Sequence, residues 1–398
     1  MSLPPSQALA APPEPLGDRL DELWALDPSL TFLNHGSFGA VPRAVRRAFV
    51  ALQERIEARP IEHIDRRLGE LLAPSRARTA ALLGVEPDSF GFVVNATEGV
   101  NAVLQSLEFA PGDELLTTSH VYNAVRNAMR YRARRTGARY VEVEVPLPLS
   151  DLDAVVDTLA ARLTPRTRLV VLDQVTSPTA LVFPVARVAA LCAERGVPLL
   201  VDGAHVPGML DVDVDALGCT YWTGNLHKWC CAPKGSAVLW VAPERRADVH
   251  PLAVSHLLDQ GFAREFDWQG TRDVAAWATI ADALAFFDEF GWERVRAHNR
   301  ALAWFAHDLW CERWQVAPIV PREHAREVFM ATVPLPEAIA RRYESPAAFQ
   351  RALYAEDRIE VPILEFGGRW HARASAQLYN RPADYERLAD AVARRAAG

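Results

Sequence analysis

The sequence predicts an α/β fold: a three-layer sandwich with a mainly parallel central sheet, followed by a smaller α+β C-terminal domain. Short runs rich in Val and Leu alternate along the chain with longer segments of helical periodicity. These runs are apolar throughout, which is typical of parallel strands buried on both faces. The 398 residues are enough for two or more domains. We predict a disordered N-terminal segment at 1–19, a large domain at 20–295 and a small domain at 296–398.

Composition narrows the class of protein. With 50% hydrophobic and 23% charged residues, the chain has the balance of an ordinary globular protein. The net charge of −7 gives no electrostatic reason to expect nucleic acid or an anionic membrane as partner. The five cysteines lack the CxxC spacing of a metal site, so we expect no metal and no disulfide framework. A cytoplasmic location is the simplest expectation, because no signal peptide or membrane span is recognisable.

The large domain is predicted to open with helices and to continue as alternating strands and helices. The first helices are expected at Leu20–Leu26, Pro42–Ala58 and Glu62–Leu83. Strands are expected at Phe90–Val94, Glu114–Thr118, Tyr140–Val145, Leu169–Leu172 and Pro198–Asp202, and helices between them at Val100–Leu107, Leu152–Leu163 and Val185–Arg195. In such a sheet, ligands bind at the carboxyl ends of the strands.

The rest of the chain is predicted with fewer strands. Ser236–Val241 is predicted to be a strand, and it could run either parallel or antiparallel to the others. His256–Asp267 is predicted to be a polar loop. Long helices follow at Val274–Phe290 and Trp292–Trp314. The small domain is predicted from Val328–Val333, Phe349–Ala355, Ile359–Val361 and His371–Leu378, with a closing helix at Ala383–Arg395.

An acid and an amine stand out at the centre of the chain. Asp202 ends a buried strand, and Lys228 lies in an apolar setting between two tryptophans. The sequence contains only two lysines, Lys228 and Lys234. A desolvated lysine amine can form a Schiff base with an aldehyde cofactor, and a strand-end Asp can keep a pyridine nitrogen protonated.

A third feature, the segment Asn95–Gly99, joins a strand to a helix. Backbone N–H groups at such a helix start can hold a phosphate, here beside Thr97. Each feature has a plainer interpretation, since Lys228 could lie on the surface, Asp202 could cap a helix and Thr97 could be an N-cap. Their joint occurrence in this order predicts pyridoxal 5'-phosphate as the cofactor.

Several segments resemble a known family. The segments Val201–His205, Gly224–Trp229 and Gly270–Asp273 look like signature segments of class V aminotransferase-fold enzymes, which are fold type I pyridoxal phosphate proteins. The segments Leu33–Gly39, Ser177–Thr179 and Arg373–Ser375, with Tyr379 and Asn380, are similar to the isopenicillin N epimerase-like branch. The resemblance spans roughly residues 31–390.

The resemblance implies a role for each candidate site residue. It implies Lys228 as the Schiff-base lysine, Asp202 at the pyridine nitrogen and His205 near the phenolic oxygen or the acid. Phosphate would bind Ala96 and Thr97 together with Thr223 or Asn225. Tyr122 would stack on the cofactor, Ser177 stands where desulfurase-type relatives often have Asn, and Arg373 would pair with the substrate α-carboxylate. Homodimers of the family place a Gly-Thr pair, here Gly270 and Thr271, against the partner's phosphate.

The reaction is expected at the Cα of an amino-acid substrate. Proton removal by Lys228 and reprotonation would give epimerisation or racemisation, with Tyr122, His35 and His205 as candidates for a second acid. β-Elimination by a C–S lyase and transamination are the alternatives. The substrate pocket is expected to draw on the loop containing Asn34 and His35, although that loop could be a plain turn. Cys230 and Cys231 invite a desulfurase interpretation, but we expect them to serve packing.

Overall fold

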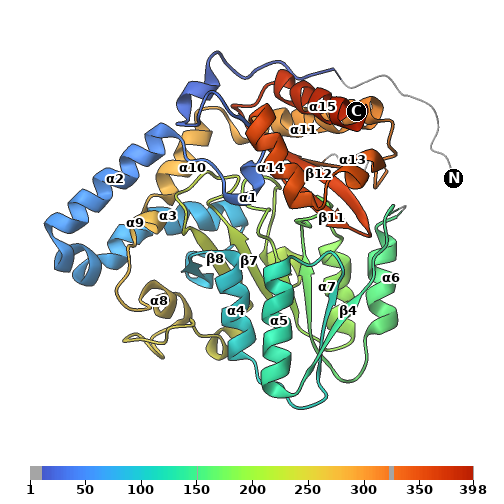
Figure 1. Ribbon diagram of the computed structural model, residues 1–398. Helices are drawn as coiled ribbons and strands as arrows, with labels where there is room; N and C mark the ends of the chain where they lie inside the picture. Colours follow the sequence, from blue (N-terminus) through green and yellow to red (C-terminus); the bar gives the residue numbers. More distant parts are fainter. Residues whose placement is uncertain (1–10, 150, 322–326, 398) are drawn as a thin grey trace.

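The computed structural model describes residues 11–149, 151–321 and 327–397 (Figure 1). Its largest sheet has seven strands: β2 (Phe90–Val93), β3 (Glu114–Thr118), β4 (Arg139–Val143), β5 (Thr167–Asp173), β6 (Leu199–Asp202), β7 (Tyr221–Asn225) and β8 (Ala237–Val241). Their order across the sheet is β2-β8-β7-β6-β5-β3-β4. All neighbouring pairs are parallel except the two that involve β8, which is antiparallel to both β2 and β7. The predicted mainly parallel sheet is confirmed.

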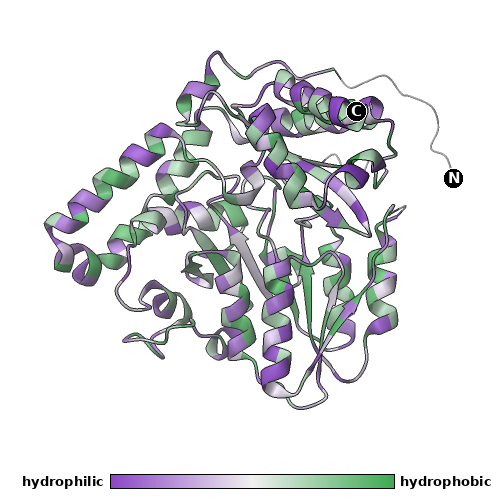
Figure 2. Cartoon of the chain, in the orientation of Figure 1, coloured by the Kyte–Doolittle hydropathy of each residue, from purple (hydrophilic) through white to green (hydrophobic). Residues whose placement is uncertain are grey.

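Helices cover both faces of this sheet, as the sandwich prediction requires. On β5, Leu169 and Val171 pack into one apolar cluster with α4 (Ala96–Ser106) and α5 (Asn123–Thr136). The alternate residues Val170 and Leu172 pack into another cluster with α6 (Asp153–Arg162) and α7 (Val185–Glu194). Figure 2 shows the strands as mostly hydrophobic ribbons between helices that carry hydrophilic residues. Apolar residues on both faces of each strand therefore account for the three layers.

The helical segments outside the sheet differ in detail from their predicted bounds. The first helix shortens to a 3-10 turn at Leu20–Leu23. The segments α1 (His35–Phe38), α2 (Arg43–Ala58), a π-helical turn at Ile61–Arg66 and α3 (Leu68–Leu83) follow. The predicted helix Val274–Phe290 divides into α9 (Ala275–Ala278) and α10 (Ile280–Asp288). Thr279 lies at the break, and its hydroxyl donates to the carbonyl of Ala275.

One predicted loop and one unassigned segment form helices. The end of the expected loop His256–Asp267 folds as α8 (Phe262–Asp267), because Phe262 and Phe266, four residues apart, bury one face of the turn. A Cβ added to Gly91 on β2 would lie 2.4 Å from Phe266, so the turn packs directly on the strand. The helix α5, which was not predicted, buries a narrow stripe of apolar residues on an otherwise charged surface.

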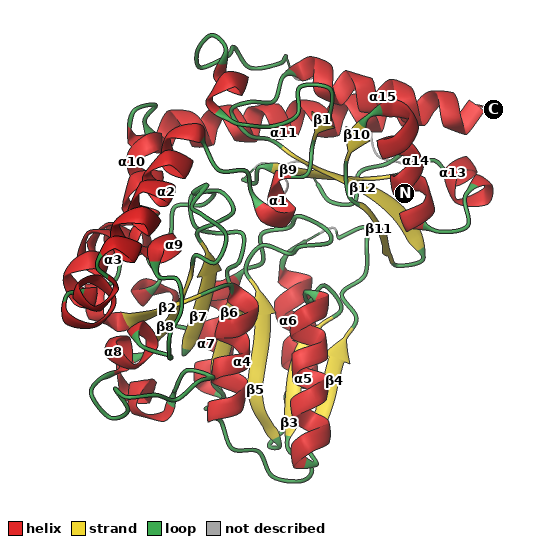
Figure 3. Cartoon of the chain, turned by 60° about the vertical axis from the view of Figure 1, so that its left-hand side comes forward, coloured by secondary structure: helices red, strands yellow, loops and turns green. Residues whose placement is uncertain are grey.

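The C-terminal part forms a second apolar core. It contains α11 (Trp292–Trp314), β9 (Met330–Pro334), α13 (Glu337–Arg342), α14 (Pro346–Asp357), β10 (Ile359–Glu360), β11 (Ile363–Phe366), β12 (Arg369–Ser375) and α15 (Pro382–Ala397). Strands β11, β12 and β9 form an antiparallel sheet, seen above the large sheet in Figure 3. Strand β1 (Thr31–Phe32) pairs with β10, and Leu33 joins this second core. The limits of the two predicted domains stay a prediction.

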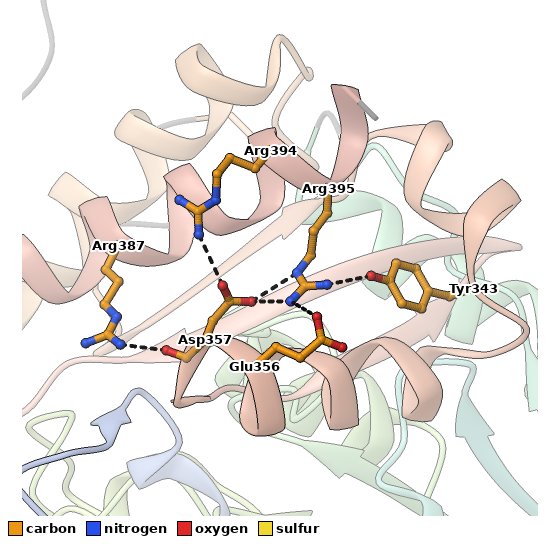
Figure 4. Close-up of polar contacts among 6 residues, drawn as sticks. All are labelled: Tyr343, Glu356, Asp357, Arg387, Arg394 and Arg395. Atoms are coloured by element: carbon orange, nitrogen blue, oxygen red, sulfur yellow. Dashed lines mark hydrogen bonds and ion pairs between the residues drawn. The ribbon is translucent and has the colours of Figure 1, made fainter.

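A polar cluster ties the end of α14 to α15 (Figure 4). The Asp357 carboxylate accepts hydrogen bonds from Arg394 at 3.1 Å and from Arg395 at 2.6 Å, and its carbonyl accepts from Arg387 at 2.7 Å. Arg395 also donates to the Tyr343 hydroxyl at 2.8 Å. The Asp357 and Arg395 side chains are only 13% and 15% exposed, so this ion pair is shielded from water.

Of the predicted disordered segment 1–19, residues 1–10 lie outside the described residues. The described part contacts the body of the protein, because the carbonyl of Glu14 accepts a hydrogen bond from His298 and Leu16 packs against the first core. Among the described helices, none is both long and apolar enough to cross a membrane.

Candidate active site

A cavity of about 300 Å³ lies at the carboxyl ends of the parallel strands. Polar side chains reach it from four neighbouring strands, because parallel strands deliver their carboxyl ends to one edge of the sheet. Lys228 follows β7, Asp202 ends β6, Asp173 ends β5 and Tyr122 follows β3. The cavity is also lined by Ser37, Phe38, Asn95, Ala96, Thr97, Ser177, His205, Asn225, His227 and Lys234.

The Lys228 side chain is buried and lines this cavity. Its Nζ lies 3.1 Å from Nε2 of His205. Burial, with the nearby Arg373 charge, lowers the pKa of Lys228 to about 7. The backbone after β7 is fixed as well, since Nε2 of His35 donates to the Lys228 carbonyl at 3.0 Å. The lysine is therefore a positioned amine that is largely unprotonated just above neutral pH.

Asp202 and Asp173 lie side by side and both line the cavity. They are Cα partners in the register of β5 and β6, and each is 3% exposed. One carboxylate oxygen of Asp202 accepts from the Ala204 N–H at 2.9 Å. Burial raises the pKa of both acids, while Lys228 and the Ala204 N–H oppose that rise at Asp202. Sequence reasoning selected Asp202 and missed Asp173.

His205 contacts the lysine rather than the acid. Its Nε2 faces Lys228 Nζ, and its Nδ1 is buried without a hydrogen-bond partner in the described part of the chain. Burial and the Lys228 charge hold the pKa of His205 well below its usual range. A neutral imidazole with Nε2 as acceptor carries its proton on Nδ1. That N–H is an unpaired donor in the site.

The start of α4 forms the expected anion cup. The Asn95 side chain caps the helix by accepting from the Glu98 N–H at 2.8 Å. The Ala96 N–H donates to the side chain of Asn225 at 2.8 Å, which links the cup to β7. The N–H and hydroxyl of Thr97 have no hydrogen-bond partner among the described residues, so both are available to donate hydrogen bonds to a phosphate.

Thr223 does not reach the cavity, although it was one of two expected phosphate ligands. Its hydroxyl donates to the carbonyl of Val238 at 2.8 Å, and a Cβ added to Gly99 would lie 2.4 Å from that hydroxyl. The side chain therefore packs β7 against α4. Asn225, two residues later, lines the cavity.

A candidate anion-binding arginine stands behind Ser177. Arg373 on β12 donates to the Ser177 hydroxyl at 2.9 Å and is 4% exposed. Its Nε has no partner within the described residues. Burial lowers the pKa of Arg373 to about 10, so it stays charged at neutral pH. Tyr122 is 44% exposed on the cavity wall.

Besides Thr223 and Arg373, four predicted residues do not line the cavity of their own chain. The amide nitrogen of Asn34 donates a hydrogen bond to the Glu360 carboxylate at 3.0 Å. His35 accepts from Tyr379 at 2.8 Å, and its other nitrogen supports the Lys228 backbone. The next residues of that loop, Ser37 and Phe38, line the cavity instead. Gly270 and Thr271 do not line it, and the Thr271 side chain is exposed.

Cys230 and Cys231 are both fully buried, and neither lines the cavity. Burial raises the pKa of both thiols, which makes them poor nucleophiles. This placement agrees with the expected packing role. Sequence reasoning did not select Lys234 for the cavity, although its type was a signal because lysines are so scarce.

These residues fit pyridoxal phosphate. The cavity is lined by a buried lysine, a buried carboxylate on the neighbouring strand and Thr97 with its unused donors. Two further lining residues, Asp173 and His205, each have a buried polar atom without a partner in the described chain, Oδ1 and Nδ1. Its volume is within the range of cofactor sites.

The sequence pattern of the aminotransferase class V family matches residues 40–342. The chain belongs to the class V aminotransferase family. It is an enzyme, and its cofactor is pyridoxal phosphate.

Two curated relatives of the class V family differ in reaction. Isopenicillin N epimerase of Amycolatopsis lactamdurans is 32% identical over 389 residues, covering 93% of this chain and 96% of the relative. A probable chloroplastic L-cysteine desulfhydrase of Arabidopsis thaliana is 30% identical over 401 residues, covering 92% and 83%.

Two solved structures share the fold. A cystine C–S lyase in complex with its product cysteine persulfide has a TM-score of 0.77 at 23% identity, covering 92% of this chain and 98% of that one. A cysteine desulfurase of Thermococcus onnurineus NA1 has a TM-score of 0.79 at 17% identity, covering 96% and 99%. These similarities establish the fold type I architecture.

Proposed function

We propose that this class V enzyme is an epimerase or racemase acting at the Cα of an amino-acid substrate. One observation carries the proposal: the cavity is lined by two groups able to move a proton, and they follow the two outer strands of the four that reach it. Lys228 follows β7, Tyr122 follows β3, and strands β6 and β5 lie between them. Inversion at a carbon atom requires a base on one side and an acid on the other.

Lys228 is proposed as the base. Bound pyridoxal phosphate supplies an electron sink that acidifies the Cα–H bond. The Lys228 amine would hold the cofactor and, once released, take the proton at Nζ, with His205 Nε2 orienting it from 3.1 Å. Its lowered pKa of about 7 keeps the amine in the unprotonated form that a base requires. Asp202 would hold the ring nitrogen protonated.

Tyr122 is proposed as the acid on the other side. Its phenol has no hydrogen-bond partner in the described residues, so it is free to carry a proton to the substrate. Arg373 and Ser177 would bind the α-carboxylate, since a guanidinium presents paired donors that match a carboxylate. Thr97, Ala96 and Asn225 would hold the phosphate.

β-Elimination by a C–S lyase is the second candidate, because the L-cysteine desulfhydrase relatives match nearly as much of the chain as the epimerases do. Both reactions begin with the same proton transfer to Lys228. A persulfide-forming desulfurase is less well supported, since neither Cys230 nor Cys231 lines the cavity.

Isotope exchange distinguishes the candidates. The enzyme, supplied with pyridoxal phosphate, is incubated with single-enantiomer amino acids in deuterated water, and mass and chirality are followed. Deuterium at Cα with inversion supports the proposal. Pyruvate with ammonia supports the lyase, and a pyridoxamine product supports an aminotransferase. In Tyr122→Phe we expect exchange to continue without inversion, whereas Lys228→Ala should abolish both.

We also infer a homodimer with shared sites. The half-buried Gly270 and the exposed Thr271 form a bend outside their own cavity, and Gly270 has φ +91 with open space around an added Cβ. If the turn completes a partner's site, mixing Lys228→Ala with Thr271→Ala chains should restore some activity in mixed dimers. Light scattering checks the mass. A cytoplasmic location stays a prediction.

A further inference from the structure

The cavity is lined by one more buried acid than the proposed chemistry uses. A pyridine nitrogen requires one carboxylate, and Asp202 supplies it. Asp173, the last residue of β5, is its register partner, is equally buried and lines the same cavity. Asp173 has no ion-pair partner among the described residues: Arg126, the nearest guanidinium on α5, is paired with Glu142 at 2.7 Å.

The two oxygens of Asp173 have different surroundings. Oδ2 accepts a hydrogen bond from the Tyr122 N–H at 3.1 Å, which fixes the first residue before α5. Oδ1 is buried and has no partner in the described chain. A charged oxygen buried without a donor is costly, whereas a hydroxyl at the same place can serve as a donor to a bound molecule.

The charges around Asp173 favour the neutral form. Asp202 on β6 brings a like charge, and two neighbouring buried carboxylates do not both ionise readily. The Tyr122 N–H, Arg126 and Lys228 favour ionisation. Burial and the Asp202 charge prevail over them and raise the pKa of Asp173 well above its usual range. Asp202 is better placed to hold the charge, because Asp173 Oδ1 is a buried oxygen without a hydrogen-bond partner in the described chain, and neither oxygen of Asp202 is.

We propose that Asp173 is a protonated positioning residue. Its Oδ2 anchors Tyr122 and its Oδ1 presents an O–H donor to the cavity, so that Asp202 alone carries the negative charge of the two acids. The proposal rests on the proposed function only in taking this cavity as the pyridoxal phosphate site. It holds for an epimerase and for a lyase alike, so the isotope experiment above and the tests below can fail separately.

Infrared spectroscopy of the holoenzyme at pH 8 reads the proton directly. The carbonyl stretch of a protonated carboxylic acid is separate from carboxylate bands and shifts in deuterated water. We expect this band in the wild type and not in Asp173→Asn. The matched control is Asp267→Asn, because burial raises the pKa of Asp267 only to about 6 and its carboxyl is ionised at pH 8. A wild-type spectrum without a band that Asp173→Asn removes would overturn the proposal.

Cofactor binding gives an independent reading. Asparagine is neutral and keeps an oxygen for the Tyr122 N–H, so Asp173→Asn should hold pyridoxal phosphate within about twofold of wild type. Asp173→Ala loses both the anchor and the donor and should bind about tenfold more weakly. Equal melting temperatures confirm that both variants fold. If Asp173→Asn instead weakens binding about a hundredfold, as expected for loss of a charge, Asp173 is ionised and the proposal fails.

Discussion

The Nζ atom of Lys228 lies 3.1 Å from Nε2 of His205. The histidine is neutral because burial and the lysine charge depress its pKa, so Nε2 accepts and the amine donates. The lysine thus has a fixed direction in the cavity, and its own depressed pKa keeps its lone pair available near neutral pH.

The rate at which the cofactor-free protein takes up pyridoxal phosphate should rise with pH and level off above about 7. The pKa of Lys228 is lowered to about 7, so the reactive unprotonated amine is lost as pH falls below that value and is complete above it. Stopped-flow absorbance across pH 5–10 measures this. An amine with an ordinary lysine pKa would keep gaining rate up to about pH 10.

Replacing His205 should slow proton transfer without preventing cofactor binding. We expect His205→Gln to retain pyridoxal phosphate and to lower kcat for Cα exchange by about tenfold to a hundredfold, since the base is no longer oriented. His250→Gln is the control, because His250 pairs with Glu265 away from the cavity. Equal rates for the two variants would remove His205 from the account.

Arg373 should act on substrate binding. Arg373→Lys keeps the charge but loses the planar paired donors, so KM for the amino acid should rise about a hundredfold while the absorption spectrum of the bound cofactor persists. Arg358→Lys is the control, since that arginine is exposed and pairs with Asp27. An unchanged KM in Arg373→Lys would mean that the α-carboxylate binds elsewhere.

Asp357 should stabilise the C-terminal unit. Asp357→Asn leaves the shielded Arg395 guanidinium without its counter-charge, and we expect it to reduce the free energy of unfolding by about 2 kcal/mol. Asp390→Asn breaks the exposed pair with Arg313, where both side chains are about half exposed, and should cost less than about 0.5 kcal/mol. Urea denaturation compares the two. Similar costs would mean that shielding from water does not strengthen the Asp357 cluster.

The sequence predicted the sheet and three of its site residues for a physical reason. Continuous apolar runs identify buried parallel strands, and the carboxyl ends of parallel strands meet at one edge. The sequence alone therefore predicts that Asp202, Lys228 and Thr97 lie in one cavity, as they do.

The predicted residues that lie away from the cavity have distant partners. Asn34 and His35 are occupied by Glu360 and Tyr379, more than 300 positions away, and no local pattern reveals such contacts. Asp173 gains its importance from strand register, which only the folded sheet defines. The Arg-rich sequence of α5 did not indicate a helix, because only three of its residues are buried, all on one face.

Reductive trapping tests the central claim that Lys228 holds pyridoxal phosphate beside Asp202. The protein is loaded with the cofactor, reduced with borohydride, digested and analysed by mass spectrometry. Because Lys228 and Lys234 are the only lysines, each serves as control for the other. We predict the cofactor mass on Lys228, its loss in Lys228→Ala and its persistence in Lys234→Ala. A label on Lys234, or no label on either lysine, would contradict the account.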